Sequence, residues 1–310
     1  MRYVAGIDGG QSATVAVVVD ERGMVRGRGT SGPADHVDEP PGATKCAAAC
    51  AAALAAAVTA AGLPKTAQFE AVVAGISGYD DGFDGAPVRL PTRVLRLVHD
   101  APIALAGAIQ SRPAVVVIGG TGSVAYAEDG SRESVTVGGW GYLFGDEGSG
   151  YAVARDALAH AMRADDRGER SPLGDAALAY FDRSDLRALA TAALRGRLSR
   201  AALASFARVV HDAARLGDPQ AESIVVAAAE SLAQLAATAI ERLGLGTRAV
   251  RVAFAGGTFG NDAFLRRTAE RLARLAPQAI VESPRYDPAL GAALLAFRAA
   301  DLAIPERIVE

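Results

Sequence analysis

The chain has 310 residues, of which 50% are hydrophobic and 22% charged, and its formal net charge is −3 at pH 7. This composition excludes a basic nucleic-acid-binding surface, and no uninterrupted apolar run reaches the roughly 18 to 20 residues that cross a bilayer. The two cysteines, Cys46 and Cys50, are too few for a disulfide scaffold. The N-terminus runs directly into a predicted strand, without the apolar core and cleavage site of a signal peptide. We therefore expect a cytoplasmic protein with no nucleic-acid or membrane partner.

The first third of the chain predicts a sheet with helices. Val-rich alternating runs indicate strands, an Ala-rich run indicates a helix, and glycines and prolines mark the turns. The strands are expected at 3–7, 13–20, 25–30, 69–76 and 93–98, and the helices at about 43–61 and 102–110. The first three strands are predicted to form an antiparallel meander.

From Ala114 the chain repeats this opening. A Val-rich strand, a Gly-Gly elbow, a second strand, the Asp129-Gly130 turn and a third strand follow in the same order. Helices are then expected at about 151–162, 185–193, 200–216 and 219–243, with a last strand at 250–255. This recurrence indicates an internal duplication of architecture, and the length suits two domains with a cleft between them.

Three β-branched runs are each followed by a glycine-rich elbow. The three segments are residues 7–14, 117–123 and 254–261. Glycine lets backbone N–H groups approach an anion, and neighbouring Ser and Thr hydroxyls add donors, so phosphate is the expected guest. One such elbow is more often an ordinary hairpin or strand exit, but three in this order favour a nucleotide clamp. The chain contains neither a Gly-x-x-x-x-Gly-Lys-Ser/Thr P-loop nor a convincing Gly-x-Gly-x-x-Gly fingerprint.

Residues 6–14, 118–123 and 254–261 resemble the two phosphate motifs and the adenosine motif of the sugar kinase, heat-shock ATPase and actin superfamily. Residues 99–101, 138–141 and 145–149 are similar to its branch of N-acetylglucosamine kinases and BadF/BadG/BcrA/BcrD ATPases. The resemblance implies an α/β fold of two actin-like (ribonuclease H-like) domains with a central interdomain cleft. Domain 1–112 would hold the first phosphate motif and the sugar side. Domain 113–310 would hold the second phosphate motif and the adenosine motif, with the packing of its last helix on the first domain left open.

The same resemblance implies an ATP and Mg²⁺ site. The ATP contacts that it implies are Gly9, Gly10, Gln11, Ser12, Thr14, Gly120, Thr121, Gly122, Gly256, Gly257 and Asn261. Phosphoryl transfer also needs a divalent ion and a carboxylate within reach of the hydroxyl proton. Asp8, at the end of the first strand, is expected to hold hydrated Mg²⁺, and its alternative role is to cap a turn. Asp100 is implied as the catalytic base, and its alternative, compatible role is a helix N-cap.

The sugar side is implied by residues from several loops. They are Asp35, His36, Ser77, Gly78, Trp140 and Asp146. Trp140 is the only tryptophan and lies among three glycines, where an indole can pack on the C–H face of a sugar; a structural Trp in a tight turn is the alternative. Related kinases tend to carry Asn-His where this chain has Asp35-His36, and a carboxylate there favours a free ammonium group. A loop histidine without a ligand is an equal alternative for His36.

We expect an ATP-dependent kinase that transfers the γ-phosphoryl group to a hydroxyl of an amino sugar, N-acetylglucosamine or glucosamine. The alternatives are a BadF-type ATPase that drives a partner protein and a non-catalytic sugar sensor. Activators of the first kind hold an iron–sulfur cluster through cysteines, and no cysteine follows Cys50. A sensor does not need a base such as Asp100. Whether the chain forms a homodimer is left open.

Overall fold

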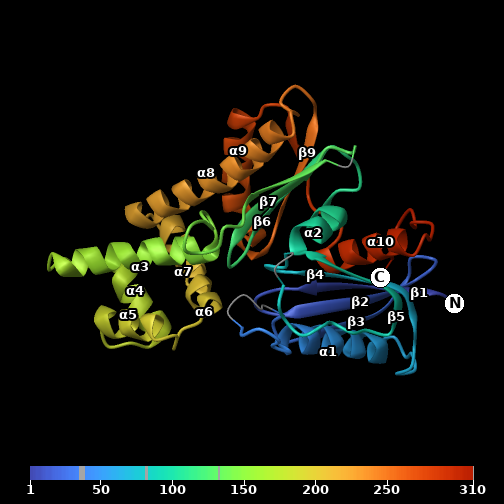
Figure 1. Ribbon diagram of the computed structural model, residues 1–310. Coiled ribbons are helices and arrows are strands. Elements are labelled where there is room, and N and C mark those ends of the chain that lie inside the picture. Colours follow the sequence, from blue (N-terminus) through green and yellow to red (C-terminus); the bar gives the residue numbers. More distant parts are fainter. Residues whose placement is uncertain (35–38, 81–82, 132, 310) are drawn as a thin grey trace. The chain divides into compact units, whose positions relative to one another are not determined.

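The computed structural model describes residues 1–34, 39–80, 83–131 and 133–309 (Figure 1). The contacts within it divide the chain into two compact units. Unit 1 comprises residues 1–111 together with the C-terminal segment from residue 283, and unit 2 comprises residues 112–282. The division falls one residue before the expected one, and the C-terminal segment lies in the first unit.

Unit 1 is a five-stranded sheet with helices on both faces. Its strands are β1 (Tyr3–Gly9), β2 (Thr14–Asp20), β3 (Val25–Ser31), β4 (Phe69–Ile76) and β5 (Thr92–His99), in the order β3-β2-β1-β4-β5. The first three form the predicted antiparallel meander, and β4 and β5 run parallel to β1. Helix α1 (Lys45–Ala60) covers one face, while α2 (Asp100–Ala108) and α10 (Pro288–Ala299) lie on the other (Figure 1).

Unit 2 is built on a second five-stranded sheet with a larger set of helices. Its strands are β6 (Ala114–Gly119), β7 (Ser123–Glu128), β8 (Ser134–Gly138), β9 (Val250–Ala255) and β10 (Ala279–Val281). Its helices are α3 (Gly150–Asp166), α4 (Pro172–Phe181), α5 (Leu186–Leu194), α6 (Arg200–Ser205), α7 (Ala207–Arg215), α8 (Pro219–Arg242), α9 (Asp262–Leu275) and the 3₁₀ turn η1 (Gly257–Gly260).

The two sheets share one topology. The strand order β10-β9-β6-β7-β8 repeats the order of the first sheet, with an antiparallel meander of three strands and two further strands parallel to its first. Each strand of unit 1 therefore has its counterpart five numbers later in unit 2. The predicted duplication of architecture is confirmed at the level of topology.

Small residues bring α10 directly onto the sheet and onto α2. A Cβ on Gly6 of β1 would lie 2.1 Å from the carbonyl oxygen of Ala289, and a Cβ on Gly291 would lie 2.0 Å from that of Ile103. Since neither position has room for a side chain, backbone packs on backbone at both contacts. These contacts fix the start of α10 above β1.

The helices differ from the sequence-based expectation in three respects. The helix predicted at 200–216 is two helices, α6 and α7, that meet at Phe206, whose fully buried ring packs on Phe181. The helix predicted at 102–110 begins earlier, at Asp100, because His99 caps it. Helices α4 and α9 lie outside the predicted ranges, and α10 is the last helix, for which the sequence gives no bounds.

One helix within the described ranges, α8, is long and apolar enough to cross a membrane. Half of its most apolar stretch is buried, and Ile224, Leu232 and Ile240 belong to the core of unit 2. A core helix of this kind satisfies the same criteria of length and hydropathy as a membrane-spanning helix.

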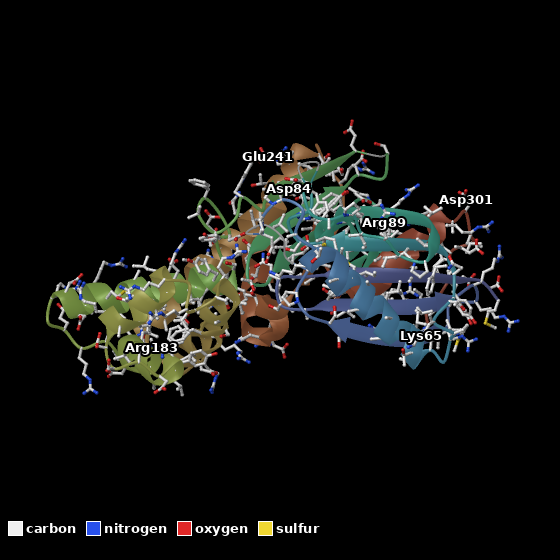
Figure 2. The ribbon with its side chains drawn as sticks, turned by 60° about the horizontal axis from the view of Figure 1, so that its bottom comes forward. Lys65, Asp84, Arg89, Arg183, Glu241 and Asp301 are labelled. Carbon is white, nitrogen blue, oxygen red and sulfur yellow. The ribbon has the colours of Figure 1, made fainter. Side chains whose placement is uncertain are left out.

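Exposed charged side chains of both signs, such as Lys65 and Glu241, lie on the outer surface (Figure 2).

Candidate active site

Two carboxylates lie at the same edge of the first sheet. Asp8 is next to the last residue of β1, and Asp100 directly follows β5. Because β1, β4 and β5 are parallel, their carboxyl ends meet at one edge, which is where α/β sheets usually present reactive groups. Asp8 also shares the face of Val4, which packs against α10, since residues at even separation along a strand point to the same side. Sequence and topology thus bring the two predicted acidic residues together.

The residue between these two carboxylates in the sheet is a glycine. Asp8 pairs with Gly75 of β4, and Gly75 pairs with Val98 of β5. A Cβ on Gly75 would lie 2.4 Å from Cδ1 of Ile103, a side chain of α2. Without a side chain at this position, α2 packs close to the sheet, and its first residue, Asp100, stays near the strand ends.

Asp8 is in an environment that disfavours its negative charge. Burial, followed by the charges of Asp100 and Asp287, raises the pKa of Asp8 to about 7. Asp287 is paired with Arg28, but Asp100 leaves a second carboxylate near the buried Asp8, and a hard cation with oxygen ligands fits this chemistry. No group of three or more His, Cys, Asp or Glu side chains in the described ranges is arranged as a ready-made metal site. Mg²⁺ usually takes one or two protein carboxylates and completes its shell with water and phosphate, and Asp8 is the residue that would hold it here.

Asp100 is the first residue of α2 rather than its cap. The N-cap is His99, whose Nδ1 accepts a hydrogen bond from the backbone N–H of Ala101 at 3.2 Å. The same Nδ1 lies 2.8 Å from Oδ1 of Asp100. This Oδ1 atom is buried, and while Nδ1 accepts the hydrogen bond from Ala101, Oδ1 has no hydrogen-bond partner among the described residues. The N-cap alternative for Asp100 is therefore wrong. Its carboxylate is left for another role.

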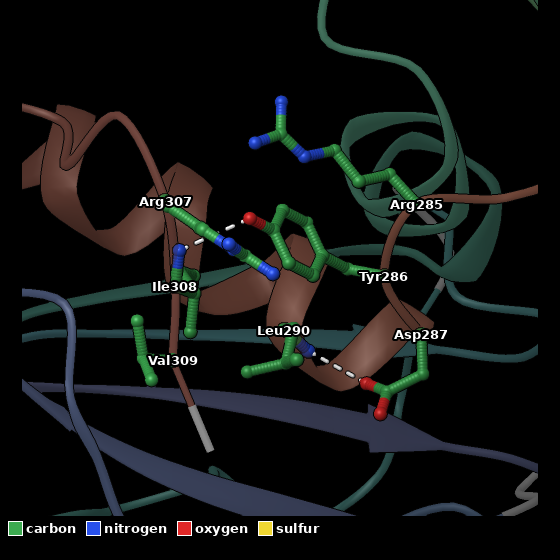
Figure 3. Close-up of a pocket in the computed structure, with 7 residues that line it drawn as sticks. All are labelled: Arg285, Tyr286, Asp287, Leu290, Arg307, Ile308 and Val309. Atoms are coloured by element: carbon green, nitrogen blue, oxygen red, sulfur yellow. Dashed lines mark hydrogen bonds between the residues drawn. The ribbon is translucent and has the colours of Figure 1, made fainter.

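Asp287 was missed by the sequence analysis. It is the N-cap of α10, where Oδ1 accepts the N–H of Leu290 at 2.9 Å (Figure 3). Its Oδ2 pairs with Arg28 of β3 at 2.8 Å. An Asp followed by Pro288 is a recognisable helix start, so the cap could have been predicted. Its electrostatic effect on Asp8 could not, because that depends on α10 of the C-terminal segment lying on β1.

The first elbow is a tight turn between β1 and β2. Gly10 donates its N–H to Ala13 at 2.9 Å, while Gln11 and Ser12 lie at the tip. Thr14 is fully buried, and its hydroxyl donates to the carbonyl of Gly32 at 2.8 Å, so this hydroxyl supports the turn.

The turn after β4 adjoins the first elbow. Ser77 donates its N–H to the carbonyl of Gly9 at 2.9 Å, and Gly78 has a positive φ of 75°. Both residues therefore lie at the edge that holds Asp8. Asp35 and His36 lie outside the described residues.

The second and third elbows adjoin each other in unit 2. They follow the parallel strands β6 and β9, which pair at Ile118 and Ala255. Gly256 has φ 99°, and a Cβ there would lie 2.4 Å from the carbonyl oxygen of Gly119. By contrast, a Cβ on Gly120 or Gly257 would meet no protein atom within 4 Å. The two elbows are thus in backbone contact, and their outer glycines border open space.

Asn261 and the residues around Gly122 have structural roles that the sequence did not specify. Oδ1 of Asn261 caps α9 by accepting the N–H groups of Ala263 and Phe264 at 3.0 and 3.1 Å. Gly122, next to Thr121, has no room for a side chain, because a Cβ there would lie 2.9 Å from the carboxylate oxygens of Asp146.

The predicted sugar residues of unit 2 differ sharply in exposure. Asp146 is 7% exposed, has a positive φ of 63°, and accepts the N–H of Ser123 at 3.0 Å. Burial raises the pKa of Asp146, although the Ser123 bond and Arg200 oppose the change. Trp140 is 77% exposed, and Phe144 is 84% exposed. Asp146 therefore lies packed beneath the second elbow, whereas the indole presents a free apolar face.

Comparison with known proteins places this geometry in a family. The chain matches the BadF/BadG/BcrA/BcrD ATPase family over residues 5–296. The N-acetylmuramic acid/N-acetylglucosamine kinase of Clostridium acetobutylicum is 30% identical over 308 residues, covering 96% of this chain and 98% of that protein. The N-acetyl-D-glucosamine kinase of Dictyostelium discoideum is 28% identical, covering 94% of this chain and 97% of that protein.

Comparison with solved structures agrees with the comparison of sequences. A protein from Chromobacterium violaceum, provisionally named N-acetylglucosamine kinase, has a structure that matches with a TM-score of 0.76 at 28% identity, covering 96% of this chain and 99% of that one. The predicted fold class, two actin-like domains of mixed sheets and helices, is confirmed by this likeness. The match over nearly the whole length shows that the chain belongs to the BadF/BadG/BcrA/BcrD ATPase family.

Proposed function

We propose that this protein is an ATP-dependent amino-sugar kinase that uses Asp8 and Asp100 as its two working carboxylates. The observation that carries the proposal is the pair itself: both lie at the carboxyl ends of parallel strands at one sheet edge, and the pKa of Asp8 is raised to about 7 by its buried, acidic surroundings. A kinase needs one carboxylate for the cation and one for the proton. The names of the related kinases support N-acetylglucosamine as the substrate class.

Asp8 would hold hydrated Mg²⁺ against the phosphates of ATP. When bound, the ion neutralises charge on the phosphate oxygens as the γ-phosphoryl group is transferred. Asp100 accepts the proton of the sugar hydroxyl, so the O–H electron pair stays on the attacking oxygen. That oxygen forms a bond to the γ-phosphorus while the bond from phosphorus to the bridging oxygen breaks. The electron pair of the broken bond leaves on ADP.

The three elbows would bind the nucleotide. In the first, Gly9 to Ser12 would face the phosphates, and the hydroxyl of Thr14 would hold the turn in shape. In unit 2, Gly120 and Gly257 leave room for a ligand beside the backbone. The remaining proposed contacts are Thr121, Gly122, Gly256 and Asn261. Backbone amides freed of Cβ atoms are suited to binding phosphate.

The proposed sugar contacts are loop residues. Ser77 and Gly78 adjoin the edge that holds Asp8, which supports their role next to the transferred phosphate. Trp140 exposes an indole face suited to the C–H face of a hexose. Oδ1 of Asp146 accepts the N–H of Ser123. Asp146 would therefore affect the sugar by holding the second elbow in place, or contact it through Oδ2. Asp35, with His36, would read the substituent at C2 and favour an ammonium group.

An ATPase that drives a partner is the second candidate. The cluster-holding cysteines of such activators have no counterpart after Cys50 in this chain. The carboxylate at Asp100 also favours a hydroxyl acceptor over a purely mechanical role, because it provides a base beside the cation site. We expect the kinase to work in the cytoplasm, where ATP is available.

ADP release over a panel of hexoses tests the proposal. With Mg²⁺ and ATP, N-acetylglucosamine or glucosamine should stimulate ADP release well above the rate with glucose. The Asp100→Asn variant should bind ATP and sugar but lose roughly a hundredfold or more in turnover, the scale expected for a general base. If no sugar of the panel changes the rate of ADP release from that measured without sugar, the partner-driving ATPase is favoured.

A further inference from the structure

His99 has two neighbours that make opposite demands on one nitrogen. Its Nδ1 accepts the N–H of Ala101 at 3.2 Å and lies 2.8 Å from Oδ1 of Asp100. A ring nitrogen that accepts a hydrogen bond offers a lone pair, whereas a carboxylate oxygen needs a donor. Nδ1 can therefore satisfy the helix cap or the carboxylate, but not both at once.

The position of the ring protons decides between these partners, and Nδ1 can cap α2 only in the neutral ring protonated on Nε2. In neutral imidazole protonated on Nε2, Nδ1 caps α2 and the buried Oδ1 of Asp100 is left without a donor. In imidazolium, Nδ1–H donates to Oδ1, and a charge-assisted hydrogen bond holds the carboxylate. A carboxylate that accepts such a bond is a weaker proton acceptor than a free one.

We propose that His99 is a positioning residue for Asp100: as imidazole it leaves the carboxylate free to take the sugar proton, and as imidazolium it ties the carboxylate down. This inference rests on the proposed kinase function, because it assigns to Asp100 the role of base. It adds a control by pH that neither Asp100 alone nor the cation site at Asp8 provides.

The charges around His99 favour the imidazolium. Burial disfavours the imidazolium, but the hydrogen bond and charge of Asp100, together with the charge of Asp80, outweigh it and raise the pKa of His99 above its ordinary value. Asp100 comes from α2 and Asp80 from the loop after β4. The side chain of His99 is 37% exposed, so it exchanges protons with solvent, while that of Asp100 is only 19% exposed.

The variant His99→Asn separates the cap from the titration. Asn is a good N-cap, so its side-chain oxygen can accept the N–H of Ala101, and its amide carries no proton that titrates in this pH range. His99→Ala removes both contacts and serves to show the cost of losing the cap. His160→Asn removes a histidine from α3 of unit 2 and serves as the matched control.

The test is the pH dependence of kcat/KM for the amino sugar at saturating Mg²⁺ and ATP. The wild type should lose activity below a midpoint higher than about 6.5, the ordinary pKa of His. In His99→Asn this midpoint should move down by about one pH unit or more, because the variant has no imidazole to titrate. His160→Asn should keep the wild-type midpoint. Repeating the profile at several Mg²⁺ concentrations excludes Asp8, because proton competition at a cation site would move the midpoint with Mg²⁺.

Nuclear magnetic resonance provides a readout that does not depend on turnover. The ring nitrogens of His99, assigned by their loss in His99→Asn, should titrate above about 6.5 in the wild type and at lower pH in Asp100→Asn. Two results would refute the positioning role. One is that all His99 variants lower activity by the same factor at every pH. The other is that the His99 ring titrates at the same pH in the wild type and in Asp100→Asn. If no sugar stimulates turnover but the ring still responds to Asp100→Asn, the kinase proposal fails while the pairing stands.

Discussion

Replacing Asp8 by Asn should stabilise the metal-free protein at neutral and alkaline pH. The fold holds Asp8 where burial and the charges of Asp100 and Asp287 raise its pKa to about 7, from the ordinary 3.8. At about 1.4 kcal/mol per pKa unit, this difference corresponds to roughly 4 kcal/mol as an upper limit. Asn has a similar shape and no charge, so it removes the penalty. A residue placed for a ligand rather than for stability behaves in this way.

The pH window of the effect follows from proton linkage. Between pH 4 and about 7 the folded protein binds a proton at Asp8 that the unfolded chain has lost, so wild-type stability falls as the pH rises through this range. The advantage of Asp8→Asn should therefore be small near pH 4, grow toward pH 7 and level off above it. Mg²⁺ with a non-hydrolysable ATP analogue should stabilise the wild type more than the variant, because the bound cation compensates the charge.

Asp20→Asn is a matched control on the same sheet with the opposite sign. Burial opposes ionisation of Asp20, but the N–H groups of Met24 and Arg22 and the guanidinium of Arg26 outweigh it and lower its pKa. The contribution of ionised Asp20 to the free energy of unfolding is present at neutral pH, and it is lost as the pH falls through the lowered pKa. Asp20→Asn should thus lower stability at pH 8.

Urea unfolding in EDTA at pH 4.5, 6 and 8 measures both effects. The midpoint of Asp8→Asn should exceed that of the wild type at pH 8, and the gap should narrow toward pH 4.5. A variant no more stable than the wild type at pH 8 would refute the view that Asp8 is strained by its charge.

Three further predictions concern the ligands. Gly120→Val and Gly257→Val should keep their thermal midpoints, because a Cβ there meets no protein atom, yet bind ATP at least tenfold more weakly by calorimetry; unchanged affinity in the folded variants would make the elbows mere strand exits. Trp140, which is 77% exposed, should be protected from acrylamide quenching by the sugar that supports turnover, and equal quenching with that sugar would remove it from the site. Asp35→Asn should shift the ratio of kcat/KM from glucosamine toward N-acetylglucosamine, and a constant ratio would contradict recognition of an ammonium group.

The sheets of both units could be predicted from the sequence because their signals are local. Val-rich strands and Gly-Gly elbows specified the two meanders, and β4 was predicted with its observed bounds, Phe69–Ile76. The same patterns pointed to Asp8 and Asp100 at strand ends. What joins these two at one edge is the parallel pairing of β1, β4 and β5, which no local pattern shows.

The remaining features depend on contacts between distant parts of the chain. Asp287 acts on Asp8 only because the small residues Gly6 and Gly291 let α10 lie on β1 and α2. His99 belongs to the motif at residues 99–101, but nothing in the sequence shows that it, and not Asp100, caps α2.

Identification of the phosphorylated product tests the central claim most directly. The purified protein should be incubated with ATP, Mg²⁺ and either N-acetylglucosamine or glucosamine, and phosphorus-31 magnetic resonance should follow the γ-phosphoryl group. We predict that a sugar phosphate ester accumulates in step with ADP, and that Asp100→Asn forms it roughly a hundredfold or more slowly. Accumulation of inorganic phosphate with ADP, and of no ester with either sugar, would contradict the assignment as an amino-sugar kinase.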